Sequence, residues 1–158
     1  MFKLLLNTQR FFSPSFSSLY SHETFHKAFS RDLGICKREL IIESPFITKN
    51  RMSVLMPLLR KLRQRDVKIV VNTRHPDEHD NGYDKQALDA IADMQAIGIK
   101  VLYTKGHHRK LAIIDRRIVW EGSLNILSFN DSCEIMRKIE SEAAAEQMIA
   151  FIAINRYS

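Results

Sequence analysis

A histidine and a lysine two residues apart, His108 and Lys110, come just before the apolar run 111–114. Alternate side chains of an extended segment share a face, so we expect these two on the same side of the chain. A lysine ammonium attracts phosphate oxygens as a point charge, and an imidazole can attack a phosphorus atom or move protons. The pair therefore indicates chemistry at a phosphate group.

A second polar cluster follows soon after. Ser123 and Asn125 could donate hydrogen bonds to phosphate oxygens, and Gly122 permits a close approach of the backbone. Glu134 lies further along, and its carboxylate could orient a histidine and fix its tautomer. Asp131 is a nearby alternative for this acidic role.

The spacing of these residues resembles the signature of the phospholipase D superfamily. His108-x-Lys110 is followed by four residues, Asp115, six residues and Gly-Ser-x-Asn, which ends at Asn125. The resemblance implies that His108 is the nucleophile or its partner acid. It also implies that Lys110 and Asn125 bind the non-bridging phosphate oxygens, with Ser123 nearby.

The same resemblance implies supporting roles for other residues. Asp115 would be a structural hydrogen-bonding residue, Gly122 a structural part of the signature, and Glu134 the acidic residue that supports the histidine. No metal or other cofactor is implied, because lysine and asparagine supply the electrostatic stabilisation often assigned to a metal. His107 and Arg109 are weaker candidates for substrate binding, and we interpret His107 as a residue that tunes the site or faces outward.

The signature occurs once, but the implied mechanism needs two histidines. A histidine nucleophile forms a covalent phosphohistidine that water hydrolyses, while a second histidine protonates the leaving oxygen. A two-fold homodimer could bring two copies of His108 together. We therefore expect a homodimer with a shared active site.

Hydrophobic periodicity predicts elements that would carry these residues. Strands and helices alternate through residues 39–103, which favours parallel pairing, and shorter strands follow. We predict an α/β fold of the phospholipase D type: a mixed, mostly parallel β-sheet flanked by helices on both faces. A single catalytic domain would span 22–158, and residues 1–21 would form an arm or a strand. The predicted helices are 22–33, 52–62, 83–97 and 141–154, and the predicted strands are 39–43, 67–71, 99–103, 111–114, 118–120 and 134–139.

The charge balance favours an anionic partner. Lysine and arginine outnumber aspartate and glutamate by 24 to 18, and the sequence pI is near 9.5. Arg60 and Arg63 lie on the helix 52–62 or at its end and could follow a nucleic-acid backbone, although such charges are often only solvated. His75 and His79 flank acidic residues, but Pro76 argues against a helix that presents both to a metal, so we interpret this segment as a solvated loop near the substrate groove.

The cysteine content and hydropathy exclude other classes. Cys36 and Cys133 form no disulfide framework or zinc motif, which fits a cytoplasmic location, and we expect Cys133 to be buried. No apolar run approaches the roughly 20 residues of a membrane span.

These observations predict a metal-independent phosphodiesterase, specifically an endonuclease acting on DNA or RNA. The alternatives are a phospholipase or phosphatidyltransferase acting on lipid, or a nucleic-acid-binding, nuclease-like module of a larger helicase or restriction system.

Overall fold

The chain folds around one seven-stranded sheet. The computed structural model describes residues 16–78, 83–129 and 131–153. The strand order is β1-β7-β6-β5-β2-β3-β4. In chain order the elements are β1 (Phe16–Ser21), α1 (His22–Ile35), β2 (Glu39–Glu43), α2 (Lys49–Gln64), β3 (Lys68–Thr73), the short helix η1 (Pro76–Glu78), α3 (Tyr83–Ala96), β4 (Lys100–Tyr103), β5 (Leu111–Ile114), β6 (Ile118–Gly122), β7 (Ile135–Glu140) and α4 (Glu142–Ile152).

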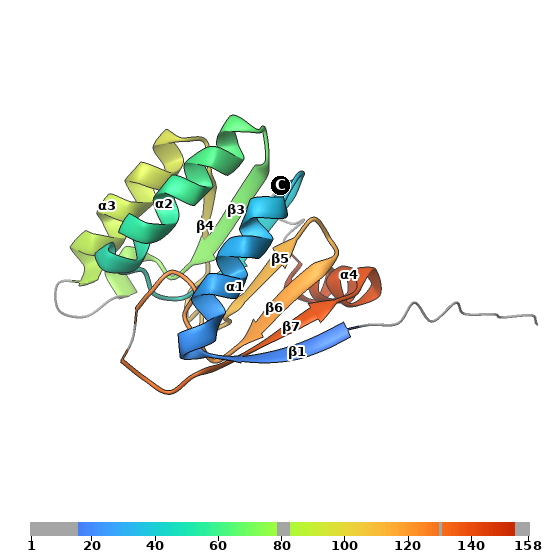
Figure 1. The fold of residues 1–158 in the computed structure, drawn as a ribbon. Coiled ribbons are helices and arrows are strands. Elements are labelled where there is room, and N and C mark those ends of the chain that lie inside the picture. The colour runs from blue at the N-terminus through green and yellow to red at the C-terminus, as the bar shows by residue number, and fades with distance from the viewer. Residues whose placement is uncertain (1–15, 79–82, 130, 154–158) are drawn as a thin grey trace, which may run out of the picture.

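Helices cover both faces of the sheet, as predicted. Figure 1 shows α1, α2 and α3 on one face and α4 on the other. Alternation along β5 divides its side chains between the two faces: Ala112 and Ile114 pack in the larger core under α1–α3, and Ile113 packs in the smaller core with Ile149 of α4. Trp120 of β6 is fully buried in the larger core. Ser141 caps α4, because its side chain accepts a hydrogen bond from the Ala144 amide at the start of the helix.

The prediction of a mostly parallel sheet is wrong in its proportions. Only β2–β3 and β3–β4 pair in parallel, whereas β1–β7, β2–β5, β5–β6 and β6–β7 are antiparallel. The physical reason is connection length. Parallel neighbours need a crossover such as α2 or α3, and the three-residue turn between β5 and β6 can join only antiparallel strands.

The segment before residue 22 contributes a strand. Phe16–Ser21 forms β1 and pairs along its length with β7, from Phe16 opposite Glu140 to Ser21 opposite Ile135. This register brings the start of α1 to the same end of the sheet as the start of β7. Residues 1–15 lie outside the described part of the chain. Cys133 is exposed, so its predicted burial is wrong: it precedes β7 instead of lying inside the strand.

Candidate active site

The candidate site lies at one end of the sheet. The carboxyl ends of the parallel strands β2, β3 and β4 meet there, because parallel strands end on the same edge. The segment 104–110 crosses this edge from β4 to the start of the antiparallel strand β5. The end of β6 and the start of β7 lie at the same edge, since both pair antiparallel with their neighbours. Residues from six strands therefore converge here.

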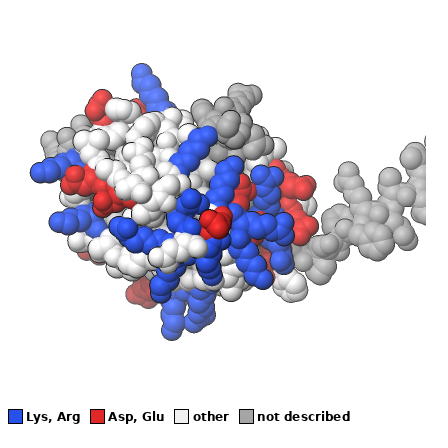
Figure 2. Space-filling model, turned by 90° about the horizontal axis from the view of Figure 1, so that it is seen from above, with Lys and Arg blue, Asp and Glu red and all other residues white. Residues whose placement is uncertain are grey.

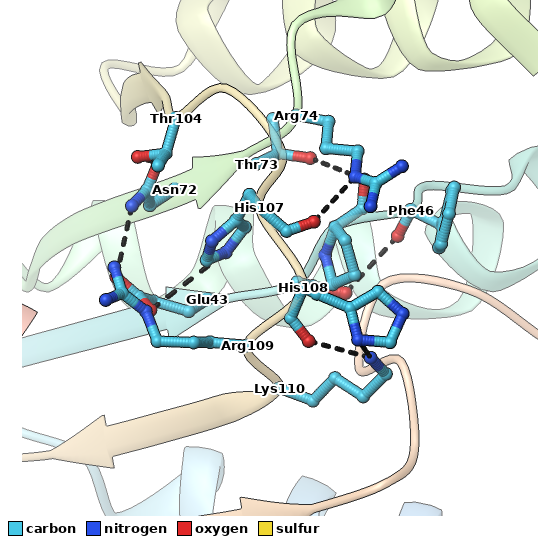
Figure 3. A network of polar contacts seen from close by, with 12 residues as sticks. Glu43, Phe46, Asn72, Thr73, Arg74, Thr104, His107, His108, Arg109 and Lys110 are labelled. Atoms are coloured by element: carbon cyan, nitrogen blue, oxygen red, sulfur yellow. Dashed lines mark hydrogen bonds and ion pairs between the residues drawn. The ribbon is translucent and has the colours of Figure 1, made fainter. Parts of the chain in front are cut away.

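His108 and Lys110 lie together on one side of the chain at this edge. Lys110 Nζ is 3.1 Å from His108 Nδ1 and donates to the His108 carbonyl at 2.8 Å. Figure 3 shows the two side chains next to each other, with His107 and Arg109 directed to the other side. His108 is exposed and Lys110 is half-buried, so both can be reached from solvent. The expected alternation extends into the segment before β5.

The ammonium of Lys110 is influenced by charges of both signs. Burial lowers its pKa below the usual value, and the nearby guanidinium of Arg74 lowers it further, while the carboxylate of Glu134 opposes this shift. Arg74 is held in place because its Nε donates to the His107 carbonyl at 2.6 Å and its guanidinium lies 5.1 Å from the centre of the Phe46 ring. Arg74 therefore adds a second cation near Lys110.

Arg74 is not among the site residues predicted from the sequence, although one signal pointed to it. Arg74 directly follows β3, and residues just beyond the carboxyl ends of parallel strands commonly line a site.

His107 faces the protein interior. Its side chain is 1% exposed, and its Nε2 lies 4.0 Å from the buried Glu43, too far for a hydrogen bond. Burial and the charges of Arg109, Arg74, Lys110 and His108 lower the pKa of His107 to about 4, so the ring is neutral at pH 7. The expectation that His107 faces outward or binds substrate is wrong, because chain alternation turns it away from His108.

Arg109 belongs to a network of polar contacts around the buried Glu43 carboxylate. Its guanidinium forms an ion pair with Glu43, donating through both Nε and Nη2. Asn72 Nδ2 donates to Glu43 at 3.1 Å, and Thr104 Oγ1 donates to Asn72 Oδ1 at 3.0 Å. These contacts, drawn in Figure 3, anchor the segment that carries His108 to β2 and β3. Arg109 thus positions the segment through its partners, although part of its side chain stays exposed.

Gly122 and Ser123 join the end of β6 to the start of β7. A Cβ atom on Gly122 would lie 2.1 Å from the Ile135 carbonyl oxygen, so only glycine fits this position. The close approach that Gly122 permits is therefore to β7. Ser123 Oγ accepts from the Ile135 amide at 3.1 Å and also bonds the carboxylate of Glu134. Ser123 is exposed, so its hydroxyl can be reached from solvent.

Asn125 and Glu134 face a shared cavity. Asn125 is 7% exposed, and its Oδ1 has no hydrogen-bond partner among the described residues. Hydrogen bonds from Ser123 and Ser132 lower the pKa of Glu134, and the positive charges of Lys110 and His22 act in the same direction. Glu134 and His108 are both described, and they share no hydrogen bond. The structure thus places Glu134 near Lys110 but does not bring it into contact with the histidine that it was predicted to orient.

Asp115 lies at the other end of β5, away from His108. Its carboxylate accepts from the backbone amides of Lys37, Arg38 and Glu39 at 2.7–3.0 Å. Burial alone would raise the pKa of Asp115, but these three donors outweigh it and hold the pKa below the usual range. Asp115 therefore fixes the start of β2, which agrees with the structural role that the resemblance implied.

Arg60 and Arg63 also lie at the end of the sheet opposite to His108. Arg63 donates to the carbonyls of Val67 and Ile97, just before β3 and β4, so its guanidinium is used by the fold. Figure 2 shows lysine and arginine side chains gathered at this end, over the turn between β5 and β6. Residues Arg60 and Arg63 do not line the site around His108, because α2 carries them to the far edge.

The described residues contain no group of three or more histidine, cysteine, aspartate or glutamate side chains that could hold a metal. His79 lies outside the described residues, and His75 Nδ1 lies 3.3 Å from an exposed Asp77 carboxylate. Within the described ranges, no helix is both long and apolar enough to cross a lipid bilayer.

Comparisons with known proteins agree with this fold. Residues 29–153 match the family model described as "Cardiolipin synthase, PLD-like domain". The structure is similar to Nuc, a phospholipase D family member from Salmonella typhimurium, with a TM-score of 0.72 and 15% identity over 87% of this chain and 91% of that chain. NucT from Helicobacter pylori gives a TM-score of 0.70 and 16% identity, over 87% of this chain and 93% of that chain.

A longer structure is also similar. Phosphatidylserine synthase from Haemophilus influenzae Rd KW20 gives a TM-score of 0.61 and 11% identity over 85% of this chain, but only 37% of that chain is covered. No curated protein sequence matches the chain. Because the family match covers most of the chain and the fold agrees with it, the chain belongs to the phospholipase D superfamily, with a domain of the cardiolipin synthase PLD-like family.

Proposed function

We propose that the chain is a metal-independent phosphodiesterase, specifically an endonuclease that cleaves DNA or RNA through a phosphohistidine intermediate in a homodimer. The observation that carries the proposal is the contact between His108 Nδ1 and Lys110 Nζ at an exposed edge of the sheet. It joins a nucleophile to a phosphate-binding cation. Asn125 and Ser123 lie in the adjoining segment and can donate further hydrogen bonds to phosphate oxygens.

The contact also suggests how substrate activates the histidine. An ammonium can only donate, so Nδ1 accepts from Lys110 and the ring proton lies on Nε2. Attack through Nε2 needs that nitrogen to carry a lone pair. A bound phosphate attracts Lys110, which frees Nδ1 to take the proton. The nucleophile is therefore activated when the phosphate is in place.

The reaction follows in two balanced steps. The Nε2 lone pair of His108 forms a bond to phosphorus, and the bond from phosphorus to the leaving oxygen breaks. A second, protonated His108 from the partner subunit gives its proton to that oxygen. The now neutral second imidazole then takes a proton from water, the water oxygen attacks phosphorus, and the bond to His108 breaks. The two imidazoles titrate as a coupled pair.

The chain's size and charge support nucleic acid as the substrate. The chain matches Nuc and NucT over nearly their full lengths, whereas it spans about a third of the phosphatidylserine synthase. Its net charge of +6 favours a polyanion. We also propose that the protein is cytoplasmic, as its cysteine content predicted.

The test is cleavage of single- and double-stranded DNA and RNA in EDTA. His108→Ala should abolish cleavage and the labelled phosphoprotein intermediate, while Lys68→Ala, an exposed lysine at the far end of the sheet, should leave both unchanged. Activity that survives His108→Ala would refute the mechanism. A fully active monomer in sedimentation would refute the shared site.

A phosphatidyltransferase is the second candidate, because the family model is named for cardiolipin synthase and one similar structure is a phosphatidylserine synthase. Release of head groups from phospholipid vesicles, with oligonucleotides left intact, would favour it over the nuclease. Binding of nucleic acid with no cleavage of any substrate would instead favour a nuclease-like binding module of a larger helicase or restriction system.

A further inference from the structure

A cavity of about 220 Å³ opens beside the candidate active site, between the start of α1, residues 124–129 and Glu134. The register of β1 against β7 creates it: Ser21 lies opposite Ile135, so His22 emerges next to Glu134. Asn125 and Glu134 belong to both the cavity and the candidate active site. The wall of the cavity consists of His22, His26, Leu124, Asn125, Ser128, Phe129 and Glu134.

Buried polar atoms without partners gather at this cavity. Among the described residues, five such side-chain atoms exist, and three belong to the cavity wall: His22 Nδ1, His26 Nδ1 and Asn125 Oδ1. A fourth, Arg51 Nη2, lies against the wall, because the Arg51 guanidinium is 5.4 Å from the centre of the Phe129 ring. Arg51 is 1% exposed. A buried polar group without a partner is unfavourable, so a ligand that satisfies several such groups is favoured.

The chemistry of the wall requires a ligand that both donates and accepts hydrogen bonds. Burial and the charges of Arg51 and His22 lower the pKa of His26 to about 4, so its ring is neutral and can donate through one nitrogen and accept through the other. Arg51 can only donate, whereas Glu134 and the Asn125 oxygen accept. A phosphodiester group offers only acceptors, and an acyl chain offers neither donors nor acceptors.

The shape of the wall favours a flat ligand. Phe129 is 43% exposed and lines the cavity, and the His26 ring meets the Phe129 ring edge-on with centroids 5.0 Å apart. Exposed aromatic rings hold unpaired nucleobases by stacking. The cavity is smaller than the roughly 300–1,000 Å³ of pockets for drug-sized molecules, so it suits one small ring system.

We propose that this cavity binds the base of the nucleotide next to the scissile phosphate, with Phe129 as the stacking surface and His22, His26 and Asn125 as hydrogen-bonding partners. The proposal rests on the proposed nuclease function and deepens it, because a base can enter the cavity only when it is unpaired. It predicts a preference for single-stranded substrates.

The test uses binding, so it does not depend on cleavage. A nucleoside 5′-monophosphate is titrated into the full chain while the imidazole ¹H–¹⁵N signals of His22 and His26 are followed. We expect both to shift, and we expect ribose 5-phosphate, which lacks the base, to leave them unchanged. Phe129→Ala should weaken mononucleotide binding roughly tenfold. Phe151→Ala, an exposed phenylalanine of α4 on the other face of the sheet, is the matched control and should have no effect.

Several outcomes would overturn the proposal. Equal shifts and affinity with ribose 5-phosphate would show that the base is not recognised. Shifts of His22 and His26 with glycerophosphocholine alone would assign the cavity to a lipid head group. If the chain cleaves nucleic acid but the imidazole signals of His22 and His26 do not shift with the mononucleotide, only the cavity proposal fails. If the mononucleotide binds as expected but no nucleic acid is cleaved, only the proposed function fails.

Discussion

The two ends of β5 carry two parts of one sequence signature, and they differ in whether their polar groups are hydrogen-bonded within the protein. At the Asp115 end, the carboxylate is fully engaged by three backbone amides, and Glu39 pairs with Lys68 and Arg116. At the His108 end, polar atoms of Asn125 and neighbouring side chains have no partner among the described residues. One part of the signature therefore stabilises the fold, while the other leaves polar atoms without partners among the described residues, as the proposed function requires.

Removing the charge of Lys110 should give the largest effect. If the proposed function holds, Lys110→Ala lowers kcat/KM for nucleic acid on the order of 10²–10³-fold, because a preorganised charge at the phosphate is lost. The free energy of unfolding should change by less than about 0.5 kcal/mol, because Lys110 stabilises little of the fold. Kinetics and urea denaturation measure the two quantities, with Lys68→Ala as the matched control. A large loss of stability in Lys110→Ala would contradict the conclusion that the two ends of β5 differ in their contribution to stability.

Replacing Asp115 should produce the reverse pattern. Asp115→Asn weakens the acceptors for three amides and should lower the free energy of unfolding by about 2–4 kcal/mol. The folded fraction should retain its chemistry, because Asp115 is a β5 length away from His108. Urea denaturation checks the first statement, and activity per folded molecule checks the second. Asp89→Asn, an exposed aspartate of α3, serves as the control. Equal stability of both variants would contradict the structural role.

This contrast explains what could be predicted from the sequence. Spacing within one segment was enough to join His108 to Lys110, because alternation is a local property. The structural role of Asp115 was expected only from the family resemblance. Alternation also sets His107 opposite to His108, but the burial of that face could not be predicted, since it depends on Glu43 and Asn72 from two other strands. The cavity also escaped prediction, because the pairing of β1 with β7 brings His22 to Glu134 across more than a hundred residues.

The buried His107 at the site end predicts a loss of stability in acid. Its pKa is about 4 in the folded chain and near 6.5 when unfolded, so the unfolded state takes up the proton first as the pH falls. Its contribution is complete above about pH 6.5 and decreases toward pH 4. His107→Gln should reduce the acid-induced loss by about 2–3 kcal/mol, measured by urea denaturation at pH 7 and pH 4. The exposed His75→Gln should not, and equal behaviour of the two variants would refute burial of His107 as the cause.

The smallest expected effect concerns Arg74 and Glu134, which act in opposite directions on Lys110 at the His108 end of β5. Arg74 adds to the lowering of the Lys110 pKa by burial, so Arg74→Ala should raise that pKa and move the basic limb of the kcat/KM profile upward. Glu134 acts in the opposite direction, so Glu134→Gln should move the same limb downward. Because the two shifts have opposite signs, a general loss of activity cannot imitate them. A limb that stays fixed in both variants would mean that Lys110 does not titrate in the rate-limiting step, and the phosphate-binding charge would then have to come from Arg74.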